Sequence, residues 1–213
     1  MSRTISDTIG DAIRKALEAA GREPLDETAI GQLSAYVSLI LRWNSRINLT
    51  AIRDEEGIIA RHIVESIDVS CKLPVGVGTV LDFGSGAGLP GIPIAICRPE
   101  IEVTLAESQN KKAAFLREAV RVLDLGTKVH SGRAEELKVR FDCVTLRAVD
   151  KMATAVSSAT GLVAPDGWLA LMTTAADADQ LKAAAGAGFT WREAAGLAGS
   201  VSRVLLLGMK SGS

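Results

Sequence analysis

The chain has 213 residues, of which 47% are hydrophobic and 23% are charged, and its formal net charge is −1. This composition is that of a folded globular protein, and it excludes a disordered chain and a uniformly basic nucleic-acid-binding protein. The amino terminus has no secretory signal pattern, and no apolar run reaches the roughly 20 residues that span a bilayer. We therefore expect a cytoplasmic protein that does not contact a membrane.

Metal and redox chemistry have little support in the sequence. The three cysteines, Cys71, Cys97 and Cys143, lie far apart in apolar segments and form no C-x-x-C pair. The only histidines are His62 and His130. We therefore expect buried, reduced thiols and no metal site.

The first third of the chain has the periodicity of helices. Apolar residues recur every four positions from Ile5 to Leu17, a second helix is expected to begin at Asp26, and a third carries the isoleucines between 58 and 67. We expect residues 1–72 to form a helical extension that packs on residues 73–213, so that the two parts make one compact unit.

Strands and helices alternate after residue 72. The expected strands are 79–83, 101–106, 127–130, 142–146, 168–172, 189–194 and 201–209, and the expected helices are 90–97, 110–124, 151–163 and 177–187. This alternation predicts an α/β fold with a mainly parallel sheet and helices on both faces. The last two strands are separated only by a loop, which predicts an antiparallel pair at one edge. Such an ending resembles that of the seven-stranded, Rossmann-like methyltransferases.

The segment from Val80 to Gly91 places four glycines between a strand and a helix. Glycine at Gly84, Gly86 and Gly88 permits left-handed backbone conformations and leaves no Cβ between the main chain and a ligand. A flat nucleoside can lie against such a turn. The segment therefore predicts a nucleotide-binding turn.

Three ligand classes use turns of this kind, and a tight turn that binds nothing is the alternative. A P-loop needs a lysine after its last glycine, but the first lysine that follows is Lys111. Residues 86–91 spell the dinucleotide pattern G-x-G-x-x-G, which is a weak signal by itself. The core from Asp82 to Gly88 has an acid on the strand and glycines at alternate positions, and it resembles the first motif of S-adenosylmethionine-dependent methyltransferases.

A second acid follows the next expected strand. Ile101, Val103 and Leu105 form a period-2 pattern that Glu107 ends. The Glu107 carboxylate is then expected beside the glycine turn, at the edge of the sheet where an acid binds ribose hydroxyl groups. The alternative is a solvated acid at a strand end.

Basic residues gather after these two motifs. Between Lys111 and Lys151 there are ten lysines and arginines against six acidic residues. Arg117 and Arg121 share one face of the helix 110–124, where they can meet phosphates or form an ordinary solvated surface.

Arg147 ends the fourth expected strand, at the same edge of the sheet as the glycine turn. An arginine that is half buried at the end of an apolar strand requires an anionic or base partner. We expect it to contact a ligand or RNA. The alternative is an internal ion pair with Glu135 or Asp150.

Several segments between residues 36 and 150 match one known family in the family's order. They are Arg42-Trp43-Asn44 with Ile47-Asn48-Leu49-Thr50, Arg61-His62-Ile63 with Ser66, Asp82 to Pro93, Lys111 with Phe115-Leu116-Arg117, Arg133-Ala134-Glu135, and Arg147-Ala148. The chain resembles the bacterial small-subunit ribosomal RNA 7-methylguanosine methyltransferases, also called the glucose-inhibited division protein B family. The run from Gly88 to Pro93 is unusual among methyltransferases at large.

The resemblance implies an enzyme that uses S-adenosylmethionine to methylate guanine N7 of 16S ribosomal RNA, at guanosine 527. It implies that Ala134 and Glu135 border the adenine of the cofactor and that Arg147 lies at the cofactor and substrate pocket. The expected cofactor-binding residues are Asp82, Gly84, Gly86, Gly88, Leu89, Glu107, Ala134, Glu135 and Arg147. The expected RNA-binding residues are Lys111, Arg117, Arg121, Arg133 and Arg147.

Three positions depart from the family's pattern. Glu65 and Glu107 each replace a usual aspartate, which keeps the charge. Thr173-Thr174 stands where the family usually has Lys-Gly, so the contact made by that lysine must be weakened or moved elsewhere.

The implied reaction requires no general base. Guanine N7 carries an in-plane lone pair and is unprotonated at neutral pH, so catalysis is mainly alignment of the donor with the acceptor. We nominate Arg147 as a catalytic, substrate-positioning residue, and we expect a monomer whose partner is 16S ribosomal RNA or the small ribosomal subunit. The alternatives are a methyltransferase of another RNA, a protein or a small molecule, and a non-catalytic nucleotide- or RNA-binding module.

Overall fold

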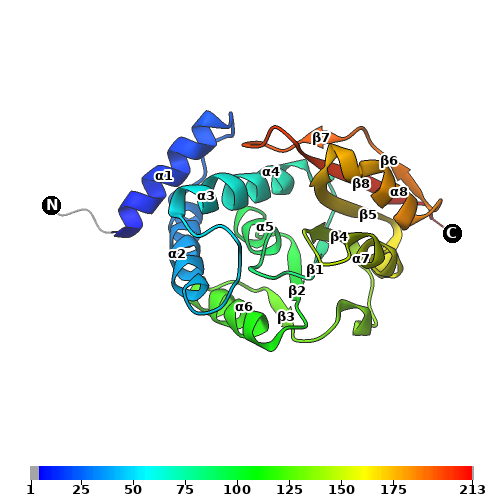
Figure 1. Ribbon diagram of the computed structural model, residues 1–213, viewed down its shortest axis with the longest axis horizontal. Coiled ribbons are helices and arrows are strands. Elements are labelled where there is room, and N and C mark those ends of the chain that lie inside the picture. Colours follow the sequence, from blue (N-terminus) through cyan, green and yellow to red (C-terminus); the bar gives the residue numbers. More distant parts are fainter. Residues whose placement is uncertain (1–4, 213) are drawn as a thin grey trace.

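The computed structural model describes residues 5–212, which form a layered α/β structure around one sheet (Figure 1). The strands follow the order β3-β2-β1-β4-β5-β8-β6, and β7 pairs only with β8. Strands β1 to β5 run parallel to one another, whereas β8 runs antiparallel to β5, β6 and β7. The strands are β1 Thr79–Phe83, β2 Glu102–Ala106, β3 Lys128–His130, β4 Phe141–Arg147, β5 Val163–Thr174, β6 Phe189–Trp191, β7 Ala195–Gly196 and β8 Arg203–Lys210.

The predicted α/β class, the seven expected strands and the antiparallel pair at the edge are confirmed, and the sheet has one strand more than expected. An eighth strand, β7, pairs Ala195 with Leu205 and Gly196 with Val204. Two residues are too few to show an alternating pattern, so this strand has no signal in the sequence. In addition, β5 begins at Val163, five residues before the expected start, because Val163 pairs with Phe141.

Helices cover both faces of the sheet. The helical segments are α1 Ile5–Ala19, α2 Glu27–Asn44, α3 Glu55–Ile58, η1 Ile59–Val64, α4 Glu65–Lys72, α5 Gly91–Cys97, α6 Asn110–Val122, η2 Ala134–Glu136, α7 Met152–Ala159, η3 Thr160–Leu162, η4 Ala175–Asp177 and α8 Ala178–Ala185. Alternate strand residues point to opposite faces, so Val80 packs with α1 to α6 while Leu81 packs with α7 and α8. Both faces are therefore buried, as in other parallel sheets.

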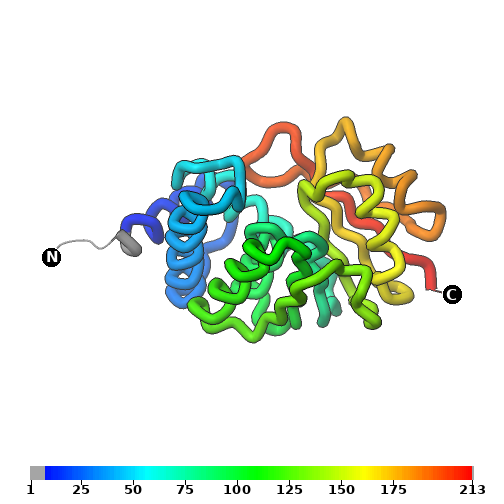
Figure 2. The backbone as a smooth tube through the Cα atoms, turned by 60° about the horizontal axis from the view of Figure 1, so that its bottom comes forward, coloured from blue at the N-terminus to red at the C-terminus, as the bar shows by residue number. Residues whose placement is uncertain are grey.

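The amino-terminal helices share a core with the sheet. Ile9, Ile13 and Leu17, the face expected from the spacing of four, are buried together with residues of α5 and α6. Helix α2 begins where predicted, because the Asp26 carboxylate accepts a hydrogen bond from the Ala29 N–H at 2.7 Å. Figure 2 shows these helices at one end of the molecule, the carboxyl-terminal strands at the other, and the green segment of the chain between them.

The third expected helix is interrupted. A π-helical segment, η1, separates α3 from α4 and includes Arg61 and His62. Such segments are uncommon and often lie at functional sites. Apolar spacing alone does not reveal it, because Ile58, Ile63 and Ile67 are all buried despite the extra residue in the turn.

The cysteines are free, and their burial differs from the prediction at one position. Cys143 is buried on β4 and Cys97 is half buried, but Cys71 is exposed because it lies on the outer side of α4. Within residues 5–212, no group of three metal-ligating side chains is close enough to hold an ion. No described helix is both long and apolar enough to cross a membrane.

Candidate active site

The glycine turn after β1 adopts the conformations that its glycines permit. Gly84, Gly86 and Gly88 have φ angles of 71°, 58° and 84°. A Cβ on Gly88 would lie 2.5 Å from Ile92 Cδ1, so this glycine is required for packing as well as for its φ angle. A Cβ on Gly86 would meet no protein atom closer than 3.9 Å. Gly86 therefore leaves open space at the turn, as expected where a ligand approaches the main chain.

Glu107 is fixed beside this turn. Its Oε2 accepts a hydrogen bond from the Gly86 N–H at 2.9 Å, and its Oε1 accepts one from the Gln109 N–H at 2.7 Å. The side chain is almost fully buried. The carboxylate therefore joins the turn to the start of α6, and each oxygen keeps a second lone pair for another donor.

Asp82 lies beneath the turn. Its carboxylate accepts hydrogen bonds from Thr145 Oγ1 at 2.9 Å and from the Gly91 N–H at 3.2 Å. Burial raises the pKa of Asp82 to about 6, although both hydrogen bonds oppose the shift. Gly91 packs against this carboxylate and against Leu105, whose Cδ2 would lie 2.3 Å from an added Cβ. Gly91, the last glycine of the run 86–91, is thus a packing glycine.

A cleft of about 1010 Å³ opens at the carboxyl ends of β1, β2 and β4. The expected residues that line it are Gly84, Gly86, Leu89, Glu107, Arg133, Ala134, Glu135 and Arg147. Five expected site residues are absent from its walls: Asp82, Gly88, Lys111, Arg117 and Arg121. The first two support the turn from below, and the other three are exposed on α6.

Lys111, Arg117 and Arg121 lie on the side of α6 that is turned away from the cleft. Lys112, one residue after Lys111, lines the cleft instead. Arg117 is directed toward β3, where it hydrogen-bonds to the Ser131 hydroxyl. The buried face of α6 includes Phe115 and Leu116, and Arg117 and Arg121 share an exposed face, as the helical spacing predicts. The periodicity therefore identified the buried side but not which exposed side chain reaches the cleft.

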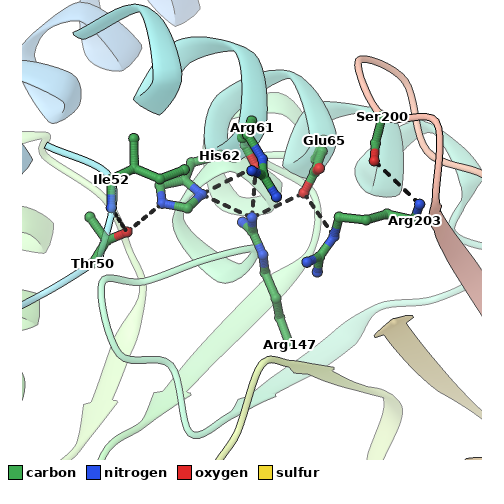
Figure 3. A network of polar contacts seen from close by, with 8 residues as sticks. All are labelled: Thr50, Ile52, Arg61, His62, Glu65, Arg147, Ser200 and Arg203. Carbon is green, nitrogen blue, oxygen red and sulfur yellow. Dashed lines mark hydrogen bonds and ion pairs between the residues drawn. The ribbon is translucent and has the colours of Figure 1, made fainter. Parts of the chain in front are cut away.

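Arg147 is bound to the amino-terminal helices (Figure 3). Its Nη2 lies 3.0 Å from Glu65 Oε2, 2.7 Å from the Arg61 carbonyl oxygen and 2.9 Å from His62 Nδ1. The internal ion pair weighed in the sequence exists, but its partner is Glu65 and not Glu135 or Asp150. Glu135 pairs with Arg133 at 3.2 Å instead.

Burial has the largest effect on the pKa values of Arg147 and Glu65. The Arg147 side chain is 8% exposed and Glu65 is fully buried. Burial lowers the pKa of Arg147 to about 10 and raises the pKa of Glu65, while their mutual attraction opposes both shifts. Nη1 of Arg147 and Oε1 of Glu65 are buried without a hydrogen-bond partner within the described chain.

Arg203 is a site residue that no motif in the sequence indicates. Its Nε lies 3.4 Å from Glu65 Oε2, so two arginines face one carboxylate (Figure 3). It comes from β8, and it lines the cleft with Arg61, Lys112 and Lys151. These four basic residues are separated in sequence and follow no common motif, so only the tertiary structure brings them together.

The loop after α2 forms another wall of the cleft. Asn44 Oδ1 accepts hydrogen bonds from the N–H groups of Leu49 and Thr50 at 3.0 and 3.1 Å, and its Nδ2 donates to the Ile52 carbonyl at 2.9 Å. Thr50 Oγ1 lies 2.6 Å from His62 Nε2. The segments 42–50 and 61–66 match the family's pattern, but the sequence indicates no role for them. The structure shows that they meet at the cleft.

Helix α2 also contacts the glycine turn directly. The buried Tyr36 hydroxyl donates a hydrogen bond to the Ala87 carbonyl oxygen. Burial raises the pKa of Tyr36, and the Asp82 carboxylate adds to the shift. Thr173 takes no part in these contacts: it is buried on β5 and borders a smaller cleft of about 310 Å³.

The sequence pattern of the family described as rRNA small subunit methyltransferase G, or GidB, matches residues 29–192. The chain belongs to this family. It is 43% identical over 164 residues to a protein named ribosomal RNA small subunit methyltransferase G from Neisseria meningitidis, and the match covers 76% of this chain and 78% of the relative. A protein of the same name from Xanthomonas euvesicatoria is 39% identical over 171 residues, which is 79% of this chain and 78% of that one.

Solved structures of more distant proteins share the fold. A methyltransferase from Pyrococcus furiosus superimposes with a TM-score of 0.61 at 14% identity, over 84% of this chain and 98% of the other. The PH0226 protein from Pyrococcus horikoshii also gives 0.61, at 13% identity, over 80% and 99% of the two chains. The architecture is therefore that of a Rossmann-like methyltransferase.

Proposed function

We propose that this protein uses S-adenosylmethionine to methylate N7 of a guanine in 16S ribosomal RNA, and that the nucleotide is guanosine 527. The observation that carries the proposal is the cleft, where the turn and Glu107 lie on one side and a group of arginines lies on the other. The first side suits a nucleoside and the second an anionic substrate. The names of the relatives support the choice of substrate.

The residues at the cleft fit the cofactor. Gly86 leaves the main chain open, and a Cβ there would fill the space that a ligand needs. We assign cofactor contacts to Gly84, Gly86, Leu89, Glu107, Ala134 and Glu135, all of which line the cleft. Asp82 and Gly88 serve the same site indirectly, because they hold the turn in shape. When bound, S-adenosylmethionine supplies an electrophilic methyl group on a sulfonium.

The role of the chain in catalysis is to position the guanine. Guanine N7 has a free lone pair, so the protein needs no base, and alignment supplies most of the rate. Arg147 is held rigidly at the cleft, where it orients the base or its phosphate without occupying N7. The guanine must leave any A-form helix to reach this position.

The RNA backbone is bound by basic residues around the cleft. Arg61, Lys112, Arg133, Lys151 and Arg203 line it and are the main phosphate contacts in this proposal. Lys111, Arg117 and Arg121, exposed on α6, make outer contacts. Both parts of the chain, 1–72 and 73–213, act as one unit because Tyr36 and Glu65 reach the site. The enzyme is proposed to work as a monomer in the cytoplasm, where its substrate is made.

Tritiated S-adenosylmethionine tests this function when it is offered with small ribosomal subunits, naked 16S RNA and free nucleosides. We expect label in RNA, at a guanine where borohydride and aniline cleave the chain. Cleavage at guanosine 527 supports the proposed nucleotide. Label on a protein or a metabolite and never on guanine in RNA would show that the rival methyltransferase function is correct.

A further inference from the structure

The loop that carries Thr50 is held in one conformation. The buried Asn44 side chain bonds to three main-chain groups of the loop, at Leu49, Thr50 and Ile52. The Ile52 N–H then donates to Thr50 Oγ1 at 3.2 Å. Thr50 is therefore a fixed part of the cleft wall, although it lies outside any helix or strand.

The contacts of His62 assign its proton. Nδ1 lies 2.9 Å from Nη2 of the cationic Arg147, whose two hydrogens are shared among Nδ1, the Arg61 carbonyl and Glu65, so a lone pair at Nδ1 is favoured over a hydrogen there. The Arg61 carbonyl lies 3.2 Å from Nδ1 and has a second lone pair besides the one that accepts from Arg147, but a hydrogen on Nδ1 would lie against the positively charged guanidinium. The proton of the neutral ring is accordingly assigned to Nε2, which donates it to Thr50 Oγ1 at 2.6 Å. Burial and Arg147 lower the pKa of His62 to about 4, which agrees with a neutral ring.

This assignment fixes the direction of the Thr50 hydroxyl. A threonine oxygen has two lone pairs and one hydrogen. His62 and the Ile52 N–H occupy both lone pairs, so the hydrogen must point elsewhere. No acceptor for it lies within residues 5–212. Thr50 therefore offers one hydrogen-bond donor at a wall of the cleft.

The position of this donor indicates which ligand it meets. In the sheet, β1 lies between β2 and β4, so the glycine turn separates Glu107 from Arg147. The nucleoside side of the cleft is the side of Glu107 and Ala134. Thr50 is linked through His62 to Arg147 (Figure 3). It therefore belongs to the Arg147 side of the cleft. The donor therefore faces the methyl acceptor and not the adenosine of the methyl donor.

We propose that Thr50 donates a hydrogen bond to an oxygen of the substrate nucleotide and that His62 is the positioning residue that forces it to do so. This inference rests on the proposed function and names one of its specificity contacts. The acceptor is either the O6 carbonyl of the guanine or a ribose or phosphate oxygen next to it. All three are oxygen acceptors, and none is the N7 atom that must stay free.

Steady-state methylation of 16S RNA tests the inference with wild type and four variants. Thr50→Val removes the hydroxyl but keeps the shape of the side chain, and Thr50→Ala removes both the hydroxyl and the methyl group. Thr50→Ser keeps the hydroxyl. Thr160→Val makes the same change to valine outside the cleft, where the hydroxyl donates to the Ser157 carbonyl oxygen of the preceding helix α7. We expect kcat/KM for RNA to fall about tenfold in the first two variants and to recover in the serine variant. KM for S-adenosylmethionine and the melting temperature should change little.

RNA that carries 2-aminopurine at the target position distinguishes the two sources of the acceptor, because this base lacks O6. If O6 is the acceptor, wild type and Thr50→Val will methylate this RNA equally; if the oxygen belongs to the backbone, the tenfold difference will persist. Equal kcat/KM of wild type and Thr50→Val on normal RNA would overturn the inference and leave the proposed function intact. A loss confined to KM for the methyl donor would also overturn it. Failure of the wild type to methylate RNA would instead refute the proposed function, and this inference with it.

Discussion

Arg147 and Glu65 form an ion pair of 3.0 Å that joins the end of β4 to the start of α4, across 82 positions of sequence. The same Glu65 oxygen lies 3.4 Å from Arg203. One carboxylate thus faces two guanidinium groups, and the local charge remains positive. A buried surplus of positive charge is costly in the unbound protein, but it suits a site that receives an RNA phosphate.

Arg147→Ala is expected to reduce methylation of RNA by about 100-fold, because the guanine loses the group that orients it. Glu65 keeps Arg203 as a counterion, so the protein should fold, with a free energy of unfolding lower by up to about 3 kcal/mol. Methylation rates and urea unfolding measure the two effects. Arg133→Ala is the control: its ion pair with Glu135 is largely exposed, so its stability should change by less than about 0.5 kcal/mol. Normal turnover in the Arg147 variant would contradict its assigned role.

Tyr36→Phe removes the hydroxyl that donates to Ala87 in the glycine turn. The carbonyl then loses its partner in a buried environment, so the free energy of unfolding should fall by about 1–3 kcal/mol. Affinity for S-adenosylmethionine, measured by calorimetry, should also fall several-fold because the turn becomes less fixed. An unchanged affinity would mean that α2 does not support the cofactor site.

Alanine at Gly88 and at Gly86 should have different effects, although both have positive φ angles. Left-handed backbone costs alanine about 1–2 kcal/mol in either place. Gly88→Ala adds overlap with Ile92, so unfolding measurements should show a further loss of about 1–3 kcal/mol. Gly86→Ala meets only open space, and its main effect should be on cofactor affinity. Equal stability losses with equal cofactor affinities would contradict this distinction.

Asp82 should make the protein less stable as the pH rises. Its pKa is raised from 3.8 to about 6 in the folded state, so the folded protein holds this proton more tightly than the unfolded chain does. The resulting stabilisation is complete below about pH 4 and is lost as the pH rises through 6. It amounts to at most about 3 kcal/mol, since one pKa unit corresponds to about 1.4 kcal/mol.

Asp82→Asn isolates this contribution, because the amide can still accept from Gly91 and donate to Thr145. The difference in the free energy of unfolding between wild type and variant should vary between pH 4 and 6 and be flat above pH 7. His62 has the opposite sign: its pKa is lowered to about 4, so its contribution is lost as the pH falls. His62 is present in both proteins, so its contribution to the free energy of unfolding cancels in the difference between them. A difference that does not depend on pH would show that Asp82 is ionised normally.

The sequence by itself determined the α/β class, the glycine turn and the acid after β2. These features depend on short patterns: apolar periodicity, the backbone freedom of Gly86, and the place of Glu107 at a strand end. The expected place of the turn beside the acid follows from these patterns alone, since parallel strands bring their carboxyl ends to one edge of the sheet. The family resemblance rests on the same local motifs.

Only the tertiary structure decided which side chains meet. Glu65, Arg147 and Arg203 come from α4, β4 and β8, and no spacing in the sequence relates them. Likewise, the choice of Lys112 over Lys111 depends on the rotation of α6 relative to the sheet, and the role of Thr50 depends on a hydrogen bond across η1. Ion pairs and hydrogen bonds need atoms within about 3 Å, and packing sets such distances whereas periodicity does not.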